Sequence, residues 1–228
     1  YREKGGEWEE FDSPIGEGNE LNVVSFSADN KKVYMIHYKD GDTGTLYSYN
    51  LETKKLNKIY QNEFVTITNV LTNYKDEAYG VRIDEDYSNF LFFNTKVEHA
   101  EIHKNLYASF RGDSVNIINS TDNGEQIIVS VNGDRNPGNY YLYNTDTNKA
   151  EYLFSRADWI KPKDMAAVEP FTFTSRDGKK LAGYLTLPKG KVDKNLPLVV
   201  NPHGGPHGPR DYWTFDWRTQ AIAAKGYA

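Results

Sequence analysis

The sequence predicts a mainly β protein that passes into an α/β unit near its C-terminus. Two observations predict this class. Most of the 228 residues repeat a pattern of short strands separated by Asp, Asn and Gly turns. The remainder places a hairpin, an apolar run, a Gly-Gly loop and a helix-like segment in succession. We therefore expect two regions, residues 1–157 and residues 158–228.

The repeat is clearest between "LYSYNLETKKLNKIY", which starts at Leu46, and "YYLYNTDTNKAEYLF", which starts at Tyr140. A weaker middle copy, "NFLFFNTK", places Asn94 between Asn50 and Asn144, with spacings of 44 and 50 residues. Repeats of this length built from short strands are typical of β-propeller blades, so residues 1–157 predict a partial β-propeller of about three blades. A β-sandwich with an accidental repeat is the alternative.

A second strand-like run lies upstream of each copy. These runs are "KKVYMIHY" from Lys31, "EAYGVRID" from Glu77 and "EQIIVSVN" from Glu125. They alternate β-branched or aromatic residues with polar ones, as strands do. The apolar period of about 3.6 that helical repeats need is missing.

The composition and charge of the chain limit the classes of partner that we expect. The net charge is -5, and no lysine cluster is longer than a pair such as Lys31 and Lys32, so we expect no nucleic acid and no anionic membrane as a partner. No apolar run approaches the roughly 18 residues of a membrane helix, and the N-terminus has no signal-peptide core. We expect a cytoplasmic protein without a cofactor. The absence of cysteine excludes disulfides, thiolate metal sites and a cysteine nucleophile.

The region from residue 158 begins with a connector that contains two prolines. "FTFTSRDGKKLAGYLTLP" then predicts a hairpin around Asp177-Gly178. "LPLVVN", Leu196 to Asn201, suits a strand buried on both faces. Tyr212 to Ala224 predicts a helix that Gly226 would end. This order is that of the opening part of an α/β domain.

The loop "NPHGGP" carries the strongest chemical signal. Gly204 and Gly205 remove every Cβ between a strand end and a helix, so their backbone N–H groups can approach a substrate closely. An α/β-hydrolase supplies half of its oxyanion hole from such a loop. Pro206 has no N–H and would only fix the loop. A simple tight turn is the alternative, and the strand before and the helix after the loop favour the oxyanion hole.

Histidines and aromatic residues near the loop are further candidates. His203 and His207 are four apart, but Gly-Gly-Pro between them prevents the helix on which that spacing binds a metal, so we expect no metal site. We expect His203 to position the loop or line a pocket and His207 to lie on the surface. Tyr212 and Trp213 could line a substrate pocket or simply pack in the core. The remaining histidines, His37, His99 and His103, sit in blade-like segments and are assigned no chemistry.

The chain resembles the prolyl oligopeptidase family of serine peptidases, and within it the acylaminoacyl-peptidase-like branch. The residues that carry the resemblance are "EPFTFTSRDGKKLAGYLTLP", "LPLVVNPHGGP" and "AIAAKGYA". The resemblance implies a β-propeller that caps an α/β-hydrolase domain and restricts entry to short peptides. It also implies that the Gly205 amide helps to bind the oxyanion, and that His203 stands where relatives carry His or Tyr.

One departure from the family pattern limits what this chain can do. Hydrolase triads follow the order serine, aspartate, histidine, with the serine in a G-x-S-x-G elbow, and this sequence has no such elbow. We therefore expect a fragment of a serine peptidase that hydrolyses short peptides, of acylaminoacyl, dipeptidyl or oligopeptidyl type. By itself we expect it to be inactive, and its unpaired strand edges predict self-association. The alternatives are a non-catalytic β-propeller that binds proteins, or an esterase or lipase.

Overall fold

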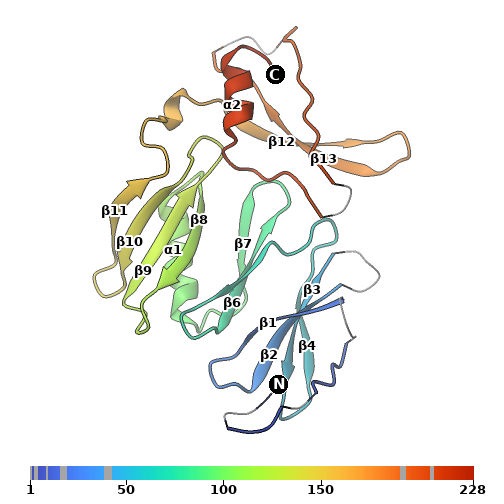
Figure 1. Cartoon of the computed structure of the whole chain (residues 1–228), viewed down its shortest axis with the longest axis vertical. Helices are drawn as coiled ribbons and strands as arrows, with labels where there is room; N and C mark the ends of the chain where they lie inside the picture. Colours follow the sequence, from blue (N-terminus) through green and yellow to red (C-terminus); the bar gives the residue numbers. More distant parts are fainter. Residues whose placement is uncertain are drawn as a thin grey trace. The chain divides into compact units, whose positions relative to one another are not determined.

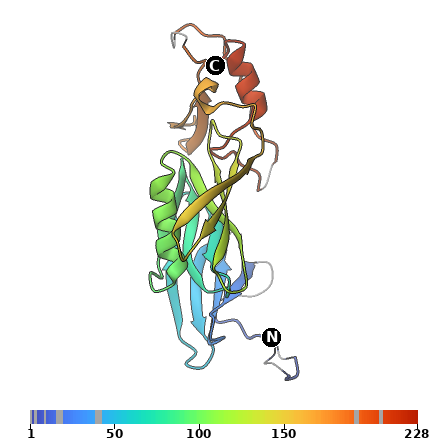
Figure 2. The same ribbon diagram turned by 90° about the vertical axis from the view of Figure 1, so that its left-hand side faces the viewer.

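The computed structural model describes residues 2, 5–8, 10–15, 20–38, 43–190, 194–205 and 208–228. The chain separates into two compact units. One comprises Tyr1–Ile83 with Leu91–Asn94, and the other comprises Asp84–Phe90 with Thr95–Ala228. Figures 1 and 2 show the strands and helices of each unit from two directions.

The first sheet is a four-stranded antiparallel meander in chain order (Figure 1). Its strands are β1 (Leu21–Phe26), β2 (Lys32–His37), β3 (Thr45–Asn50) and β4 (Leu56–Tyr60). Strand β2 is buried on both faces because its alternate side chains enter two cores. Tyr34 and Ile36 pack with Leu46 in one core, whereas Val33 and Met35 pack in the other.

The second sheet has three strands, β5 (Asn69–Thr72), β6 (Ala78–Asp84) and β7 (Ser88–Phe92). Helix α1 (Glu98–Ser109) follows it. His99 and His103, which we expected in blade-like segments of short strands, both lie on α1 instead. The helix forms because its buried residues recur at helical spacing and pack together on one face. These residues are His99, Ala100, Ile102, His103 and Leu106.

The third sheet is again a four-stranded antiparallel meander. Its strands are β8 (Ser114–Ser120), β9 (Gln126–Asn132), β10 (Asn139–Asn144) and β11 (Lys149–Ser155). The alternate residues Ile127, Val129 and Val131 of β9 point to one face, as the period of a strand requires. Ile102 and Leu106 of α1 pack against these valines and isoleucine, so the helix and the third sheet share a core.

The repeat in the sequence corresponds to equivalent strands. Leu46 lies in β3 and Tyr140 in β10, the third strand of each four-stranded meander. Asn50 and Asn144 make the same turn after these strands, since Asn50 Oδ1 accepts from Thr53 N at 2.8 Å and Asn144 Oδ1 accepts from Thr147 N at 2.8 Å. The predicted repeat is confirmed. Several successive antiparallel sheets fit a propeller-like domain, and none of the sheets in the described residues closes on itself.

The predicted hairpin is also confirmed. Strands β12 (Val168–Thr174) and β13 (Lys180–Thr186) pair antiparallel and are preceded by a short 3-10 helix, η3 (Pro162–Asp164). Gly178 occupies the left-handed region in the turn, with φ of 84°. Ser175 Oγ accepts from Lys179 N at 3.2 Å and donates to Asp177 Oδ1, which closes the turn.

The expectation of a buried strand at Leu196 to Asn201 is wrong. No strand forms there, and Leu198 is 65% and Val200 77% exposed. The segment makes two backbone hydrogen bonds of 2.8 Å, from Val199 N to Ala228 O and from Ala228 N to Pro197 O. These two bonds have the pattern of a parallel pair. A strand buried on both faces needs packed neighbours on both faces, and the described residues do not supply them.

The expected helix begins later than Tyr212. Helix α2 spans Trp217–Ala224 because Asp216 caps its N-terminus, with its carboxylate accepting from Arg218 N and Thr219 N. Gly226 ends it, as predicted, with φ of 93°. No helix in the described part of the chain is long and apolar enough to cross a membrane.

A candidate oxyanion loop and its surroundings

The Gly-Gly loop lies in the open. All residues from 201 to 205 are exposed. Nothing lies within 4 Å of the position that a Cβ on Gly204 would occupy. The backbone at Gly204 is therefore accessible to another molecule. Pro206 and His207 lie outside the described residues.

His203 contacts its own loop. Its Nδ1 lies 2.7 Å from the carbonyl oxygen of Gly204, so an Nδ1–H would donate to that oxygen. This contact orients the Gly204–Gly205 peptide group locally. The imidazole ring is otherwise exposed.

The segment after the loop is held by side chains. The Arg210 guanidinium donates to the carbonyl oxygen of Asp84 and lies 5.0 Å from the centre of the Tyr212 ring. Nearby, the Tyr184 hydroxyl of β13 donates to the carbonyl oxygen of Asp86 at 2.7 Å. Residues 84–86 are thus tied both to the hairpin and to the segment that follows the loop.

The two aromatic candidates lie in different environments. Tyr212 is 42% exposed, whereas Trp213 is 8% exposed. The Trp213 indole Nε1 donates to Val168 O at 2.9 Å, and its ring meets Tyr87 edge-on at a centroid distance of 5.3 Å. Tyr212 therefore has a free surface for a ligand, and Trp213 packs between β12 and the residues before β7.

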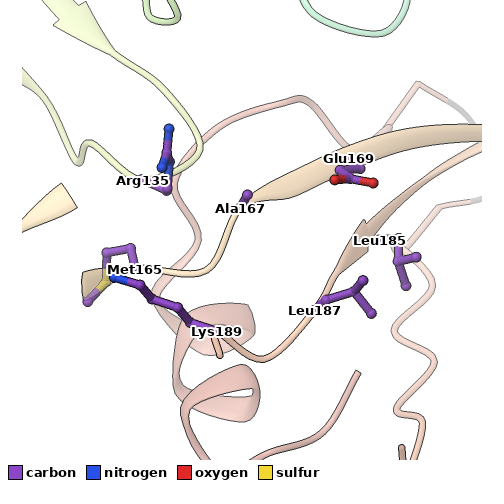
Figure 3. A pocket seen from close by; sticks show the side chains of 7 residues that line it. All are labelled: Arg135, Met165, Ala167, Glu169, Leu185, Leu187 and Lys189. Atoms are coloured by element: carbon purple, nitrogen blue, oxygen red, sulfur yellow. The ribbon is translucent and has the colours of Figure 1, made fainter. Parts of the chain in front are cut away.

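A pocket of about 230 Å³ lies at the start of the hairpin rather than at the loop (Figure 3). Two cationic side chains and one carboxylate stand around aliphatic walls, which suits a small amphipathic ligand. None of the candidate site residues lines it, although Glu169, Leu185 and Leu187 belong to the stretch "EPFTFTSRDGKKLAGYLTLP" that carries the resemblance. The lining residues are Arg135, Met165, Ala167, Glu169, Leu185, Leu187 and Lys189.

The turn between β9 and β10 contains buried polar groups that the sequence did not mark as important. Asp134 is 5% and Asn136 5% exposed. The Asn136 amide donates to Asp113 Oδ2 at 2.8 Å. Burial raises the pKa of Asp113 above its ordinary value. The signal that could have revealed this turn is the polar run "NGDRNPGN" between two apolar strands.

No group of three His, Asp or Glu side chains in the described residues is arranged to hold a metal ion. The buried histidine His103 contacts the backbone, since its Nε2 lies 2.8 Å from Val115 O. Burial lowers the pKa of His103 to about 4.

Comparison with known proteins agrees with the antiparallel sheets. No family model matches the chain. The dipeptidyl aminopeptidase BIII of Pseudoxanthomonas mexicana is 27% identical over 98% of this chain and 33% of its own length. The chain resembles dipeptidyl peptidases. Dipeptidyl peptidase family member 6 of Caenorhabditis elegans is 24% identical over 90% of this chain and 30% of its own length.

Two solved structures have a fold similar to that of this chain. A Bacteroides ovatus protein named for dipeptidyl aminopeptidase IV matches with a TM-score of 0.55 and 17% identity, over 90% of this chain and 32% of its own. Prolyl oligopeptidase B of Galerina marginata, solved with a 35-residue substrate, matches with a TM-score of 0.50 and 14% identity, over 78% and 25%. The chain spans about a third of the length of the curated relatives DPP BIII and family member 6. One is named as a dipeptidyl aminopeptidase and the other as a dipeptidyl peptidase, and neither is named as an acylaminoacyl peptidase.

Proposed function

We propose that the protein is a serine-type peptidase that acts on short peptides, of dipeptidyl or oligopeptidyl type. The observation that carries the proposal is the exposed Gly-Gly loop in a chain that is 27% identical, over nearly its whole length, to a dipeptidyl aminopeptidase. A backbone free of side chains suits the approach of a scissile carbonyl group. An acylaminoacyl preference is a narrower version of the same proposal.

In this proposal the amide of Gly205, with that of Gly204, stabilises the negative charge of a tetrahedral intermediate. Donors of this kind act most strongly when they are already in position, because no reorganisation is needed as the charge develops. His203 supports the loop through its contact with the Gly204 carbonyl oxygen. Tyr212 offers an exposed aromatic face to the substrate.

The serine elbow of a hydrolase is the part that this sequence does not provide. The 228 residues contain no G-x-S-x-G elbow. We propose that the chain by itself is inactive, because an oxyanion hole without an activated nucleophile does not complete acyl transfer. The propeller-like sheets would restrict entry to short peptides.

The proposal is tested by labelling the natural protein and the 228-residue chain with a fluorophosphonate probe, followed by peptide mapping of the adduct. We expect a labelled serine in the natural protein and no label on the chain. Correctly folded natural protein that takes no label would contradict the peptidase proposal and favour the protein-binding β-propeller. A label on a serine of these 228 residues would contradict the inactivity of the chain.

A further inference from the structure

Residues 166–168, where the connector passes into β12, are held by side chains from three other segments. Ala166 N donates to Gln220 Oε1 at 2.9 Å, and Gln220 Nε2 donates back to Ala166 O at 2.8 Å. Val168 N donates to Asp134 Oδ2 at 2.8 Å, while Val168 O accepts from Trp213 Nε1 at 2.9 Å. The backbone groups of both residues are thus satisfied by side chains.

Two of the three segments that supply these side chains are also bonded to each other. Gln220 Nε2 donates to the carbonyl oxygen of Asp134 at 3.3 Å, so the turn after β9 and helix α2 meet at Ala166. Gln220, Asp134 and Trp213 are each at most 8% exposed. Because these side chains are buried, each of their hydrogen bonds must keep its geometry. A buried amide or carboxylate without its partners costs free energy.

Trp213 approaches closely because the turn after β9 has no side chain at one position. A Cβ on Gly133 would lie 3.2 Å from Trp213 Cη2, tighter than an ordinary contact. The indole therefore packs closely in one position between the turn and Val168. An apolar residue of similar size could fill the volume. It could not donate to Val168 O, however, so it would not fix the position of residue 213 relative to Val168.

The contact of His203 Nδ1 with the Gly204 carbonyl oxygen orients one peptide group of the Gly-Gly loop but does not fix where the loop lies. Its residues are exposed, and Gly204 has open space around it. Its position must then come from the segments that anchor it. On the downstream side these anchors are Arg210, through its bond to Asp84 O, and Trp213, through its bond to Val168 O.

We propose that Gln220, Asp134 and Trp213 form a clamp on residues 166–168 whose role is to position the Gly-Gly loop. These three are positioning residues, and none of them contacts the reacting atoms. The inference rests on the proposed function, since the loop must be the oxyanion loop for its position to affect turnover. The clamp itself is a feature of contacts that can be tested without any activity.

The first measurement is spectroscopic and needs no substrate. In the natural protein, Phe replaces the exposed tryptophans of this region, Trp8, Trp159 and Trp217, which are 74%, 73% and 70% exposed, together with any tryptophan outside these 228 residues. The remaining indole of Trp213 should emit at short wavelength because it is buried. Gln220→Met, which keeps the volume and removes the three hydrogen bonds of the side-chain amide, should shift that emission to longer wavelength.

The second measurement is kinetic. In the natural protein, Gln220→Met should lower kcat by up to about 100-fold with KM little changed, because a small displacement of a catalytic group weakens only the transition state. The matched control is Gln61→Met, the same change at an exposed glutamine that accepts from Lys58 Nζ. It should leave kcat and the emission unchanged.

A gentler pair of variants guards against misfolding. Trp213→Phe keeps an aromatic ring and removes the donor to Val168 O, so kcat should fall as it does in Gln220→Met. Trp159→Phe is the control, since that indole is 73% exposed. The proposal is overturned if kcat falls only in proportion to the folded fraction measured by circular dichroism, or if emission and kcat are both unchanged.

Failure of the proposed function has a different signature. In that case the unmodified natural protein takes no fluorophosphonate label and shows no peptidase activity. The emission of Trp213 then tests whether the clamp exists, independently of any activity. A shift of the emission in Gln220→Met supports the clamp, and an unchanged spectrum overturns it.

Discussion

At the scale of single residues, burial decides how His103 responds to pH. The ring packs 4.7 Å from the Phe90 ring, and its Nε2 is bonded to the carbonyl oxygen of Val115. Burial is the main cause that lowers the pKa of His103 to about 4, and the bond to Val115 opposes it only in part. The folded chain therefore takes up this proton less readily than the unfolded chain.

A pH dependence of stability follows from this difference. Because the folded pKa lies below the ordinary value of about 6.5, the contribution of His103 is complete above that pH and is lost as the pH falls towards about 4. We expect the free energy of unfolding to fall by up to about 1.4 kcal/mol per pH unit within this window. Urea denaturation at a series of pH values measures it.

The variant His103→Gln should flatten this dependence without abolishing it. Burial lowers the pKa of His99 on the same helix as well, so part of the slope belongs to that residue. Asn105→Gln, at an exposed position of the same helix, changes no titratable group, so it serves as the control and should keep the slope of the unmodified chain. An equal slope in His103→Gln and in the unmodified chain would show that His103 does not titrate in this way.

At the scale of elements, helix α2 depends on one side chain for its start. The Asp216 carboxylate accepts from Arg218 N at 2.7 Å and from Thr219 N at 3.0 Å. Burial raises the pKa of Asp216, but the bonds from the Thr219 and Arg218 amides outweigh it, so that the pKa lies below its ordinary value. The cap thus stabilises the fold above the ordinary pKa of the carboxyl and is lost as the pH falls through the lowered one.

Asp216→Ala should lower the free energy of unfolding by about 1 kcal/mol at neutral pH. The matched control is Asp211→Ala, at an exposed position before the helix, which should have little effect. Denaturation of both variants in acid provides the further check, since the difference between Asp216→Ala and the unmodified chain should shrink there. A difference that stays constant in acid would mean that the carboxylate is not the capping group.

The elements that the sequence predicted are those built from local bonds. The turns at Asn50, Asn144 and Gly178 close over three to five residues, so the strands beside them could be assigned from the pattern alone. The prediction of a strand at Leu196 to Asn201 was wrong because an apolar run indicates only that a segment tends to be buried. It does not show which segments pack against it. Helix α1 was missed because a repeat of strands was extended across it.

The site divides in the same way. The Gly-Gly loop was visible from its residues, whereas the clamp joins Asp134, Ala166 and Gln220 across up to 86 positions of the chain. Only the packed structure brings such groups together. Trp213 shows the same limit, since an aromatic residue after a loop has the same sequence signature whether it meets a substrate or the core.

At the scale of the whole molecule, an exposed apolar segment lies before the Gly-Gly loop. Leu198 is 65%, Val199 43% and Val200 77% exposed, and these three neighbours form a contiguous apolar stretch. Exposed apolar backbone with few partners is a template for pairing with another chain. We propose that the 228-residue chain self-associates through this segment.

Sedimentation velocity at increasing concentration tests this proposal. The unmodified chain should show a sedimentation coefficient that rises with concentration, and Val200→Lys should weaken the rise because a charge must then be buried at the contact. Ile118→Lys makes the same change at an isolated residue of β8 that is 54% exposed, and it should sediment as the unmodified chain does. A clean monomer at all concentrations would contradict self-association. Equal weakening by both lysines would place the contact elsewhere than on residues 198–200.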